Sequence, residues 1–431
     1  MVCRLPWGEL SALGLLADDA LLMSNNHHKN NMRILSIFAA FLASTLIAGA
    51  QTCLFHTGDS TGYPYRIPAI AKAKNGQLIA LSDLRPCGGD IGYGRVDILS
   101  RVSTDNGASW SEAVPVLQGS GKGADAGYGD ACLVADRDRN ELLLVCVSGD
   151  VPYWKSSPEH RQRIVATHAR YNKKNGKWEW SPLPPFDLTK QVYDDIFGGR
   201  IRGLFMGSGR ICQSRMVKVG KYYRLYGALC THRGNFVIYS DDFGRTWNAL
   251  GSAEVSCAPS GDEPKCEELP DGSVLLSSRR SGGRFFNVFR YTDTAKAKGV
   301  WGQPADTRFA PGGIKNESGA CNGEILIVPC HRADGKATTL ALQSLPAGPG
   351  RSNVTIYWKE LVAAADYNTP LRFASNWQGA FRVTSLGSAY STMVQQADGR
   401  IAFFYEEEPQ YYQMIYKAID LSEITGGKFV K

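Results

Sequence analysis

A short pattern, Ser-x-Asp-x-Gly-x-Ser/Thr-Trp, occurs twice in the sequence and constrains the fold more than any other feature. The two copies are Ser103–Trp110 and Ser240–Trp247, and each follows a run of β-forming residues. The Asp carboxylate of such a turn accepts hydrogen bonds from nearby backbone N–H groups, and the Gly adopts a positive φ. The Trp then packs between neighbouring sheets. A repeated β unit of this kind predicts a β-propeller.

The region 51–431 is otherwise a succession of short β runs separated by Gly, Asn, Asp and Pro. Examples are Gly76–Leu84, Glu141–Gly149, Ser273–Arg280 and Arg400–Glu408. Such spacing is typical of all-β sandwiches, barrels and propellers. No low-complexity linker divides the region, so we expect residues 51–431 to form one all-β domain.

Residues 32–50 have the organisation of a secretory signal peptide. Arg33 supplies the positive charge, Ile34–Ile47 the apolar segment, and Ala48–Ala50 the small residues of a cleavage site. The apolar segment is shorter than the ~20 residues of a membrane-spanning helix. We therefore expect an exported protein, periplasmic or secreted, that begins at Gln51 and has no stable membrane span. An uncleaved anchor is the alternative.

A polar stretch, residues 24–31, stands ahead of this segment, where signal peptides do not normally carry one. We infer that translation starts at Met32 or Met23 rather than at Met1. Residues 1–50 are accordingly treated as an N-terminal extension and signal peptide outside the fold.

Charge and cysteine content exclude some functions. The net charge of +7 favours anionic ligands, but no dense Lys/Arg run is present, so we expect no nucleic-acid binding. Cys132 and Cys146 lie symmetrically about a turn, and they are expected either to face each other as a disulfide or to be free buried thiols. No Cys/His spacing resembles a zinc site, so we expect no structural metal and no cofactor.

Several motifs occur together in one order along the chain. They are Tyr65-Arg66-Ile67-Pro68, the loop Ser82–Gly92, the segment Gly261–Gly272 and Gly387–Ser391 followed by a strand pair. In this order the region 51–431 resembles the bacterial sialidases of glycoside hydrolase family 33. The resemblance implies a six-bladed β-propeller and an enzyme that removes terminal α-linked sialic acids from glycans, glycoproteins or glycolipids.

The substrate of this family explains its arginines. Sialic acid carries an ionised carboxylate on its anomeric carbon, and guanidinium groups bind a carboxylate bidentately. The three arginines of the family fall on Arg66, Arg279 and Arg351, with Arg280 as an alternative to Arg279. The glutamate that supports the first arginine falls on Glu406.

The loop Ser82–Gly92 resembles the one that carries the catalytic acid in this family. The match makes Asp90 the general acid/base and places Arg85 in the pocket, with Asp97 as an alternative acid. Asp130 matches an aspartate that contacts the N-acyl or C4 region of the sugar. Any one of these residues, taken alone, is as easily a turn residue.

The tyrosine motif is the most distinctive part of the resemblance. It makes Tyr390 the nucleophile, and sialidases are a known exception to the carboxylate nucleophile of glycosidases. A neutral phenol avoids the repulsion between a carboxylate nucleophile and the substrate carboxylate. Because a phenol has a pKa near 10, it needs a base beside it. Glu263 matches that base, and Glu267 and Glu268 are nearby competitors.

Three functions follow from these motifs. The first is an exo-sialidase acting by retaining double displacement, the second a trans-sialidase with the same catalytic core, and the third a non-catalytic glycan-binding propeller. A binder has no need of the Tyr390–Glu263 couple, so we favour an enzyme, which we expect to be a monomer. Tyr153, Trp154 and Phe205 are expected to line the pocket rim or to pack in the core.

Overall fold

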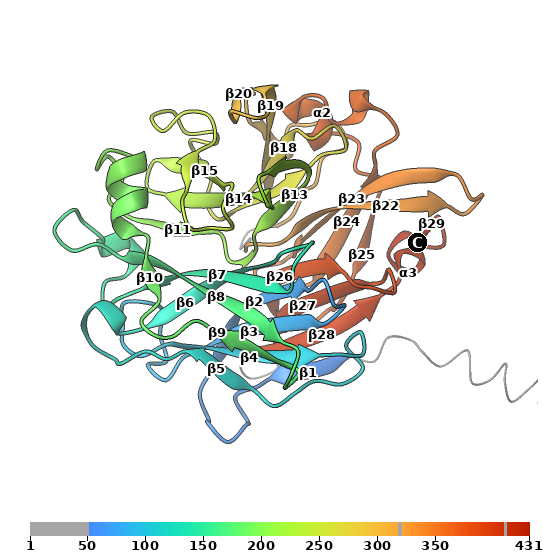
Figure 1. Ribbon diagram of the computed structural model, residues 1–431. Coiled ribbons are helices and arrows are strands. Elements are labelled where there is room, and N and C mark those ends of the chain that lie inside the picture. Colours follow the sequence, from blue (N-terminus) through green and yellow to red (C-terminus); the bar gives the residue numbers. More distant parts are fainter. Residues whose placement is uncertain (1–50, 318–320, 409–411) are drawn as a thin grey trace, which may run out of the picture. The chain divides into compact units, whose positions relative to one another are not determined.

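The computed structural model describes residues 51–317, 321–408 and 412–431. The extension and the predicted signal peptide, residues 1–50, lie outside the described residues. The described strands form six sheets of four to six strands each, which we call blades 1 to 6 in chain order (Figure 1). Within each blade the strands are antiparallel, except that β12 runs parallel to β6.

The first three blades occupy the N-terminal half. Blade 1 contains β2 (Tyr65–Lys72), β3 (Leu78–Leu84), β4 (Asp97–Ser103) and β5 (Val114–Leu117). Blade 2 contains β6 (Tyr128–Ala135), β7 (Glu141–Ser148), β8 (Arg163–Asn172), β9 (Lys177–Trp180), β10 (Phe186–Asp187) and β12 (Gly209–Arg210). Blade 3 contains β11 (Leu204–Met206), β13 (Cys212–Val219), β14 (Tyr222–Thr231), β15 (Gly234–Ser240) and β16 (Asn248–Ala249).

The other three blades complete the arrangement. Blade 4 contains β17 (Pro264–Glu268), β18 (Val274–Arg280), β19 (Gly283–Asp293), β20 (Lys298–Trp301) and β21 (Ala305–Asp306). Blade 5 contains β22 (Ile325–Arg332), β23 (Ala337–Pro346), β24 (Val354–Glu360), β25 (Gly379–Arg382) and β29 (Phe429–Val430). Blade 6 contains β1 (Thr52–Phe55), β26 (Ser388–Gln395), β27 (Ile401–Glu407) and β28 (Gln413–Ile419).

Helices are few and short. Two α-helices are described, α2 (Pro370–Ala374) and α3 (Leu421–Thr425). The other helical segments are a six-residue π-helix, Gln191–Ile196, and three single 3-10 turns, Gly123–Asp125, Tyr153–Lys155 and Ala364–Asp366. No helix among the described residues is long and apolar enough to cross a membrane.

Apolar side chains fill the space between consecutive blades. Each cluster joins two neighbours: Leu133 of blade 2 packs with Leu81 of blade 1, and Trp247 of blade 3 packs with Leu143 of blade 2. Equivalent clusters join blades 3 and 4, 4 and 5, 5 and 6, and 6 and 1. The sheets therefore close into a ring, and the six-bladed β-propeller expected from the sequence is confirmed.

The first and last described strands, β1 and β29, each pair with a strand that is distant from them in sequence. Strand β1 pairs with β28, with Thr52 opposite Tyr416, and so completes blade 6 (Figure 1). Strand β29 pairs with β22, with His331 opposite Val430, at the edge of blade 5. The β1–β28 pairing thus links the start of the described chain to its last blade by backbone hydrogen bonds.

The repeated pattern forms a hydrogen-bonded turn in both copies. Asp105 accepts from the Ser109 N–H at 2.9 Å, and Asp242 accepts from the Thr246 N–H at 2.8 Å. The indole N–H of each Trp donates to the carbonyl of the turn Gly, at 3.2 Å in the first copy and 3.1 Å in the second. Gly107 has φ 83°, a conformation that favours glycine.

The cysteine alternatives are settled by strand register. Cys132 lies opposite Val145 on β7, so the side chain of Cys146 points to the other face of the sheet. Cys132 packs between blades 2 and 3, whereas Cys146 packs between blades 1 and 2. Of the two alternatives, the hairpin disulfide does not form, and both residues are free buried thiols.

Candidate active site

A β-bulge reshapes each of three strands at the same cavity. The register shifts between Arg66 and Ala69 on β2, between Gly129 and Cys132 on β6, and between Ser388 and Ser391 on β26. Bulges redirect side chains and occur often beside active sites. The three shifts lie next to Arg66, Asp130 and Tyr390, which all line a cavity of about 220 Å³.

Two residues at these bulges have an unusual backbone. Ile67 has φ 59° and Asp130 has φ 56°, both in the left-handed region. For a β-branched residue this conformation is a genuine outlier, and such strain persists only where the surroundings hold it. The backbone N–H of Ile67 donates to Glu406 Oε1 at 2.7 Å, which accounts for how it is held.

The arginines predicted to bind a carboxylate converge on Tyr390. The guanidinium carbon of Arg66 lies 5.6 Å from the centre of the Tyr390 ring, and that of Arg351 lies 5.7 Å from it. Arg279 Nη1 lies 3.5 Å from the Tyr390 hydroxyl. The arrangement places three guanidinium groups around one side chain.

Glu406 supports the first of these arginines. It is fully buried and accepts from Arg66 Nε at 2.8 Å and from Arg66 Nη2 at 3.2 Å. Despite burial, this carboxylate raises the pKa of Arg66. The guanidinium is therefore fixed in place and charged.

Tyr390 and Glu263 form the shortest polar contact in the site. The Tyr390 hydroxyl donates to Glu263 Oε1 at 2.5 Å, and Arg279 Nη1 donates to Glu263 Oε2 at 2.9 Å. Burial and the Glu263 carboxylate raise the pKa of Tyr390 well above its usual value. The phenol is therefore protonated at neutral pH and held against a carboxylate that can accept its proton.

The three alternatives to the predicted arginine and base lie elsewhere. Arg280 pairs with Asp306, at 3.4 Å. Glu267 pairs with Arg210, at 2.5 Å, and Glu268 binds Ser214 and Arg215. Between Arg279 and Arg280, it is Arg279 that contacts Tyr390. Among Glu263, Glu267 and Glu268, it is Glu263.

The two candidate acids have different surroundings. Asp90 lines the cavity with its side chain 48% exposed, and its Oδ1 lies 3.2 Å from Arg85 Nη2. Asp97 is buried, binds Arg95 at 2.8 Å and accepts from the Gly119 N–H at 2.8 Å. Asp90 lines the cavity and Asp97 does not, so of the two carboxylates Asp90 is the one placed to exchange a proton with a ligand there.

A further carboxylate, Asp83, was not predicted from the sequence. It is fully buried, binds Arg85 Nη2 at 3.1 Å and accepts from the Asp130 N–H at 3.3 Å. Burial raises the pKa of Asp83, and burial with the Asp90 charge raises that of Asp130. Strand alternation was the signal that could have found Asp83. Side chains two residues apart lie on the same face of a strand, so Asp83 shares a face with Arg85.

Aromatic side chains also line the cavity. Tyr153 and Phe205 pack edge to face with ring centres 5.0 Å apart, and both line the cavity with Trp154. Trp154 is 62% exposed, and its ring centre lies 6.0 Å from that of Tyr93. All three aromatic residues therefore lie at the pocket, as the rim interpretation expects.

Tyr412 is another residue that the sequence did not single out. The centre of its ring lies 4.6 Å from the guanidinium carbon of Arg66. Among the described residues, no group of three or more His, Cys, Asp or Glu is arranged to hold a metal ion.

No family model matches the sequence. Among curated proteins, the sialidase of Micromonospora viridifaciens is 29% identical over 365 residues, which cover 80% of this chain and 50% of that protein. The sialidase of Paraclostridium sordellii is 24% identical over 391 residues, covering 88% of this chain and 92% of that protein. The chain thus spans about half the length of the first relative and nearly all of the second.

Solved structures with the same fold are sialidases and trans-sialidases. The Hadza microbial sialidase Hz136 matches 87% of this chain and 69% of its own, with a TM-score of 0.66 at 20% identity. A leech intramolecular trans-sialidase matches 90% of this chain and 73% of its own, with a TM-score of 0.64 at 15% identity. The chain is thus similar in sequence to bacterial sialidases, and its six-bladed β-propeller is the fold that these solved structures share.

Proposed function

We propose that the protein is an exo-sialidase that hydrolyses terminal α-linked sialic acids by a tyrosine nucleophile. The observation that carries this proposal is the 2.5 Å contact between Tyr390 and Glu263. A propeller that only binds glycans has a use for the three arginines but none for a buried phenol held against a carboxylate. The sialidase relatives support the same class of reaction.

In the first step the substrate carboxylate binds Arg66, Arg279 and Arg351. The Tyr390 oxygen attacks the anomeric carbon while its proton passes to Glu263. The bond from that carbon to the leaving oxygen breaks, and the oxygen takes a proton from Asp90. The products are a covalent sialyl-tyrosine and the released glycan.

In the second step water attacks the same carbon from the side that the leaving group vacated. Asp90 accepts a proton from the water, and the tyrosine oxygen leaves and recovers its proton from Glu263. Two inversions give net retention. The arginines hold the carboxylate through both steps, so positive charge faces it throughout.

Release of fluorophore from 4-methylumbelliferyl α-sialoside tests the proposal in the wild type and in Tyr390→Phe. We expect turnover in the wild type and a loss of at least about a thousandfold in the variant, as for a missing nucleophile. Tyr222→Phe is the matched control, because its hydroxyl binds Glu141 away from the cavity. No release by the wild type, with sialyllactose also intact, would leave the glycan-binding propeller as the better account.

Product identity separates hydrolysis from transfer. The structural relatives include trans-sialidases, so the sialyl-tyrosine is expected to react with water, with a second glycan or with a hydroxyl of the same sugar. Hydrolysis yields free sialic acid even when lactose is present in excess. A sialylated lactose or an anhydro sugar, identified by mass spectrometry and NMR, would replace hydrolysis with a transfer reaction on the same tyrosine.

Export and oligomeric state are part of the same proposal. A protein that acts on glycoconjugates outside the cytoplasm needs the signal peptide proposed for residues 32–50. We expect Gln51 at the N-terminus of the protein isolated from its own host and a monomer in solution. Intact mass identifies the N-terminus, and a protein that retains residue 32 would contradict cleavage before Gln51. Light scattering measures the oligomeric state, and a stable dimer would contradict the expected monomer.

A further inference from the structure

One buried carboxylate lies between the two strands that lead away from the Tyr390–Glu263 contact. Lys265 on β17 follows Glu263 by two residues, and Thr392 on β26 follows Tyr390 by two. The two side chains meet at Glu324, which comes immediately before β22. The three side chains belong to blades 4, 6 and 5.

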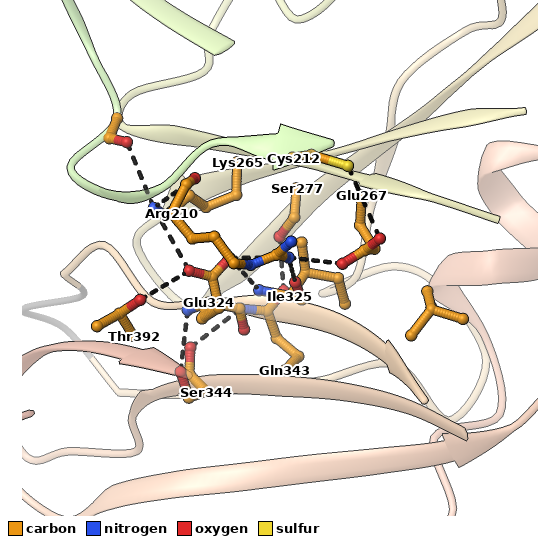
Figure 2. Close-up of polar contacts among 12 residues, drawn as sticks. Arg210, Cys212, Lys265, Glu267, Ser277, Glu324, Ile325, Gln343, Ser344 and Thr392 are labelled. Carbon is orange, nitrogen blue, oxygen red and sulfur yellow. Dashed lines mark hydrogen bonds and ion pairs between the residues drawn. The ribbon is translucent and has the colours of Figure 1, made fainter. Parts of the chain in front are cut away.

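The contacts converge on one oxygen. Thr392 Oγ1 donates to Glu324 Oε2 at 2.9 Å, and Lys265 Nζ lies 3.5 Å from the same atom. The exposed fractions of Glu324, Lys265 and Thr392 are 0%, 1% and 0%. Figure 2 shows Glu324 with Arg210 above it and Thr392 beside it.

The position of Glu324 is set by a third blade. Its N–H donates to Ser344 Oγ at 2.9 Å, and its carbonyl accepts from Gln343 Nε2 at 3.1 Å (Figure 2). Both partners belong to β23. Because its backbone is bound to blade 5, the carboxylate cannot follow β17 or β26 if either strand shifts.

The charges in this cluster make the contact costly to break. Glu324 Oε1 lies 3.6 Å from Arg210 Nη2, so the carboxylate faces two cations, Lys265 and Arg210. A buried charge that loses its partner is strongly unfavourable. Displacement of β17 would separate Lys265 from Glu324, and displacement of β26 would break the hydrogen bond from Thr392 to the same oxygen. The cluster therefore favours one separation of the two strands over others.

We propose that Glu324 is a positioning residue that sets the distance between Glu263 and Tyr390 through Lys265 and Thr392. The inference rests on the proposed function, because the distance matters only if Tyr390 is the nucleophile. Catalytic groups must be held to a fraction of an ångström, and misplacement by about 1 Å costs up to about a hundredfold in rate. The substrate arginines are not part of this cluster.

Thr392→Val removes the hydroxyl while it preserves shape, and Thr392→Ser restores the hydroxyl. For Thr392→Val we expect kcat on the aryl sialoside to fall by about tenfold or more, with KM within about twofold. Thr392→Ser should return kcat to within about threefold of the wild type. Glu324→Gln, which removes the charge, should show the same division between kcat and KM.

Thr425→Val is the matched control for lost stability. Thr425 is also buried and its hydroxyl donates to the Leu421 carbonyl, but it lies in α3 and contacts no residue of the site. We expect a similar decrease in Tm and an unchanged kcat. Equal kcat values for Thr392→Val and Thr425→Val would overturn the positioning role, as would a Thr392→Ser variant as slow as Thr392→Val.

A readout without turnover separates this inference from the proposed function. In a crystal structure of Thr392→Val we expect the Tyr390 hydroxyl to lie beyond 3.5 Å from Glu263, compared with 2.5 Å in the intact chain. If the wild type has no activity, the proposed function fails while this measurement still stands. An unchanged distance in the variant would refute the positioning role whatever the activity.

Discussion

Arg66 and Glu406 come from blades 1 and 6 and form a two-point ion pair, with Arg66 Nε and Nη2 at 2.8 and 3.2 Å from the two carboxylate oxygens. The same carboxylate accepts from the backbone N–H of Tyr390 at 3.2 Å. One buried side chain therefore orients both Arg66, the arginine proposed to bind the substrate, and the strand that carries the proposed nucleophile.

Glu406→Gln tests this shared role. The amide keeps the size of the side chain but loses the charge and one acceptor, so Arg66 is no longer fixed. We expect KM to rise and kcat to fall together, each by about tenfold, because the carboxylate acts on both groups. Steady-state kinetics with the aryl sialoside measure both parameters.

Glu407→Gln is the neighbouring control, since its carboxylate accepts from Tyr405 and Gln51 instead. Its kinetics should match the wild type. A Glu406→Gln variant that changes KM alone would show that the bond to the Tyr390 N–H has no catalytic consequence.

Arg279 and Arg280 are adjacent in sequence but point to different partners. Arg279→Lys loses the bidentate guanidinium beside Tyr390 and should raise KM by about tenfold or more. Arg280→Lys should leave KM within about twofold, because Arg280 is partly exposed and pairs with Asp306. Inhibition by a sialic acid analogue gives a second measure of carboxylate binding, and a larger effect at Arg280 would reverse the assignment.

The effect of the leaving group on kcat/KM distinguishes Asp90 from Asp97 as the general acid. A glycan leaving group needs a proton, whereas methylumbelliferone leaves readily without one. Asp90→Asn should therefore reduce kcat/KM for sialyllactose at least about tenfold more than for the aryl sialoside. Asp97→Asn should lower Tm and affect both substrates equally, and the opposite pattern would make Asp97 the acid.

The turn aspartate Asp105 predicts a pH dependence of stability. Hydrogen bonds from Ser109 and Ser103 lower the pKa of Asp105 to about 2 in the folded protein, against about 3.9 in an unfolded chain. A lowered carboxyl pKa contributes stability that is present above about pH 4 and is lost as the pH falls towards 2.

Urea unfolding of the wild type and Asp105→Asn at pH 5 and pH 3 measures this contribution. The wild type should be the more stable at pH 5, and the difference should shrink at pH 3. Because the side chain is exposed, we expect an effect at the lower end of the range for hydrogen bonds to charged groups. A difference independent of pH would exclude ionised Asp105 as its source.

Sequence alone predicted the parts of the molecule that short patterns specify. The Ser-x-Asp-x-Gly-x-Ser/Thr-Trp turns and the β runs were enough for an all-β fold and a propeller, and the resemblance to sialidases implied six blades. The motif residues Arg66, Glu263 and Tyr390, which the same resemblance singled out, come together although they lie on three blades.

What the sequence did not predict depends on register and on long-range contacts. A shift of one residue decides whether Cys132 and Cys146 share a face, and a turn sequence does not specify it. In the sequence, Asp83 is one residue of a β run, and Glu324 stands at the start of another. Their roles arise from partners on other blades, which no local pattern records.

The pairing of β1 with β28 also determines when the site can exist. The first described strand has no partner until the last blade has been made, and contacts between such distant segments form slowly during folding. Arg66 likewise lacks Glu406 until blade 6 is in place. A chain that ends before blade 6 lacks both the partner of β1 and the carboxylate that holds Arg66, so we expect it to form neither a closed ring nor an assembled site.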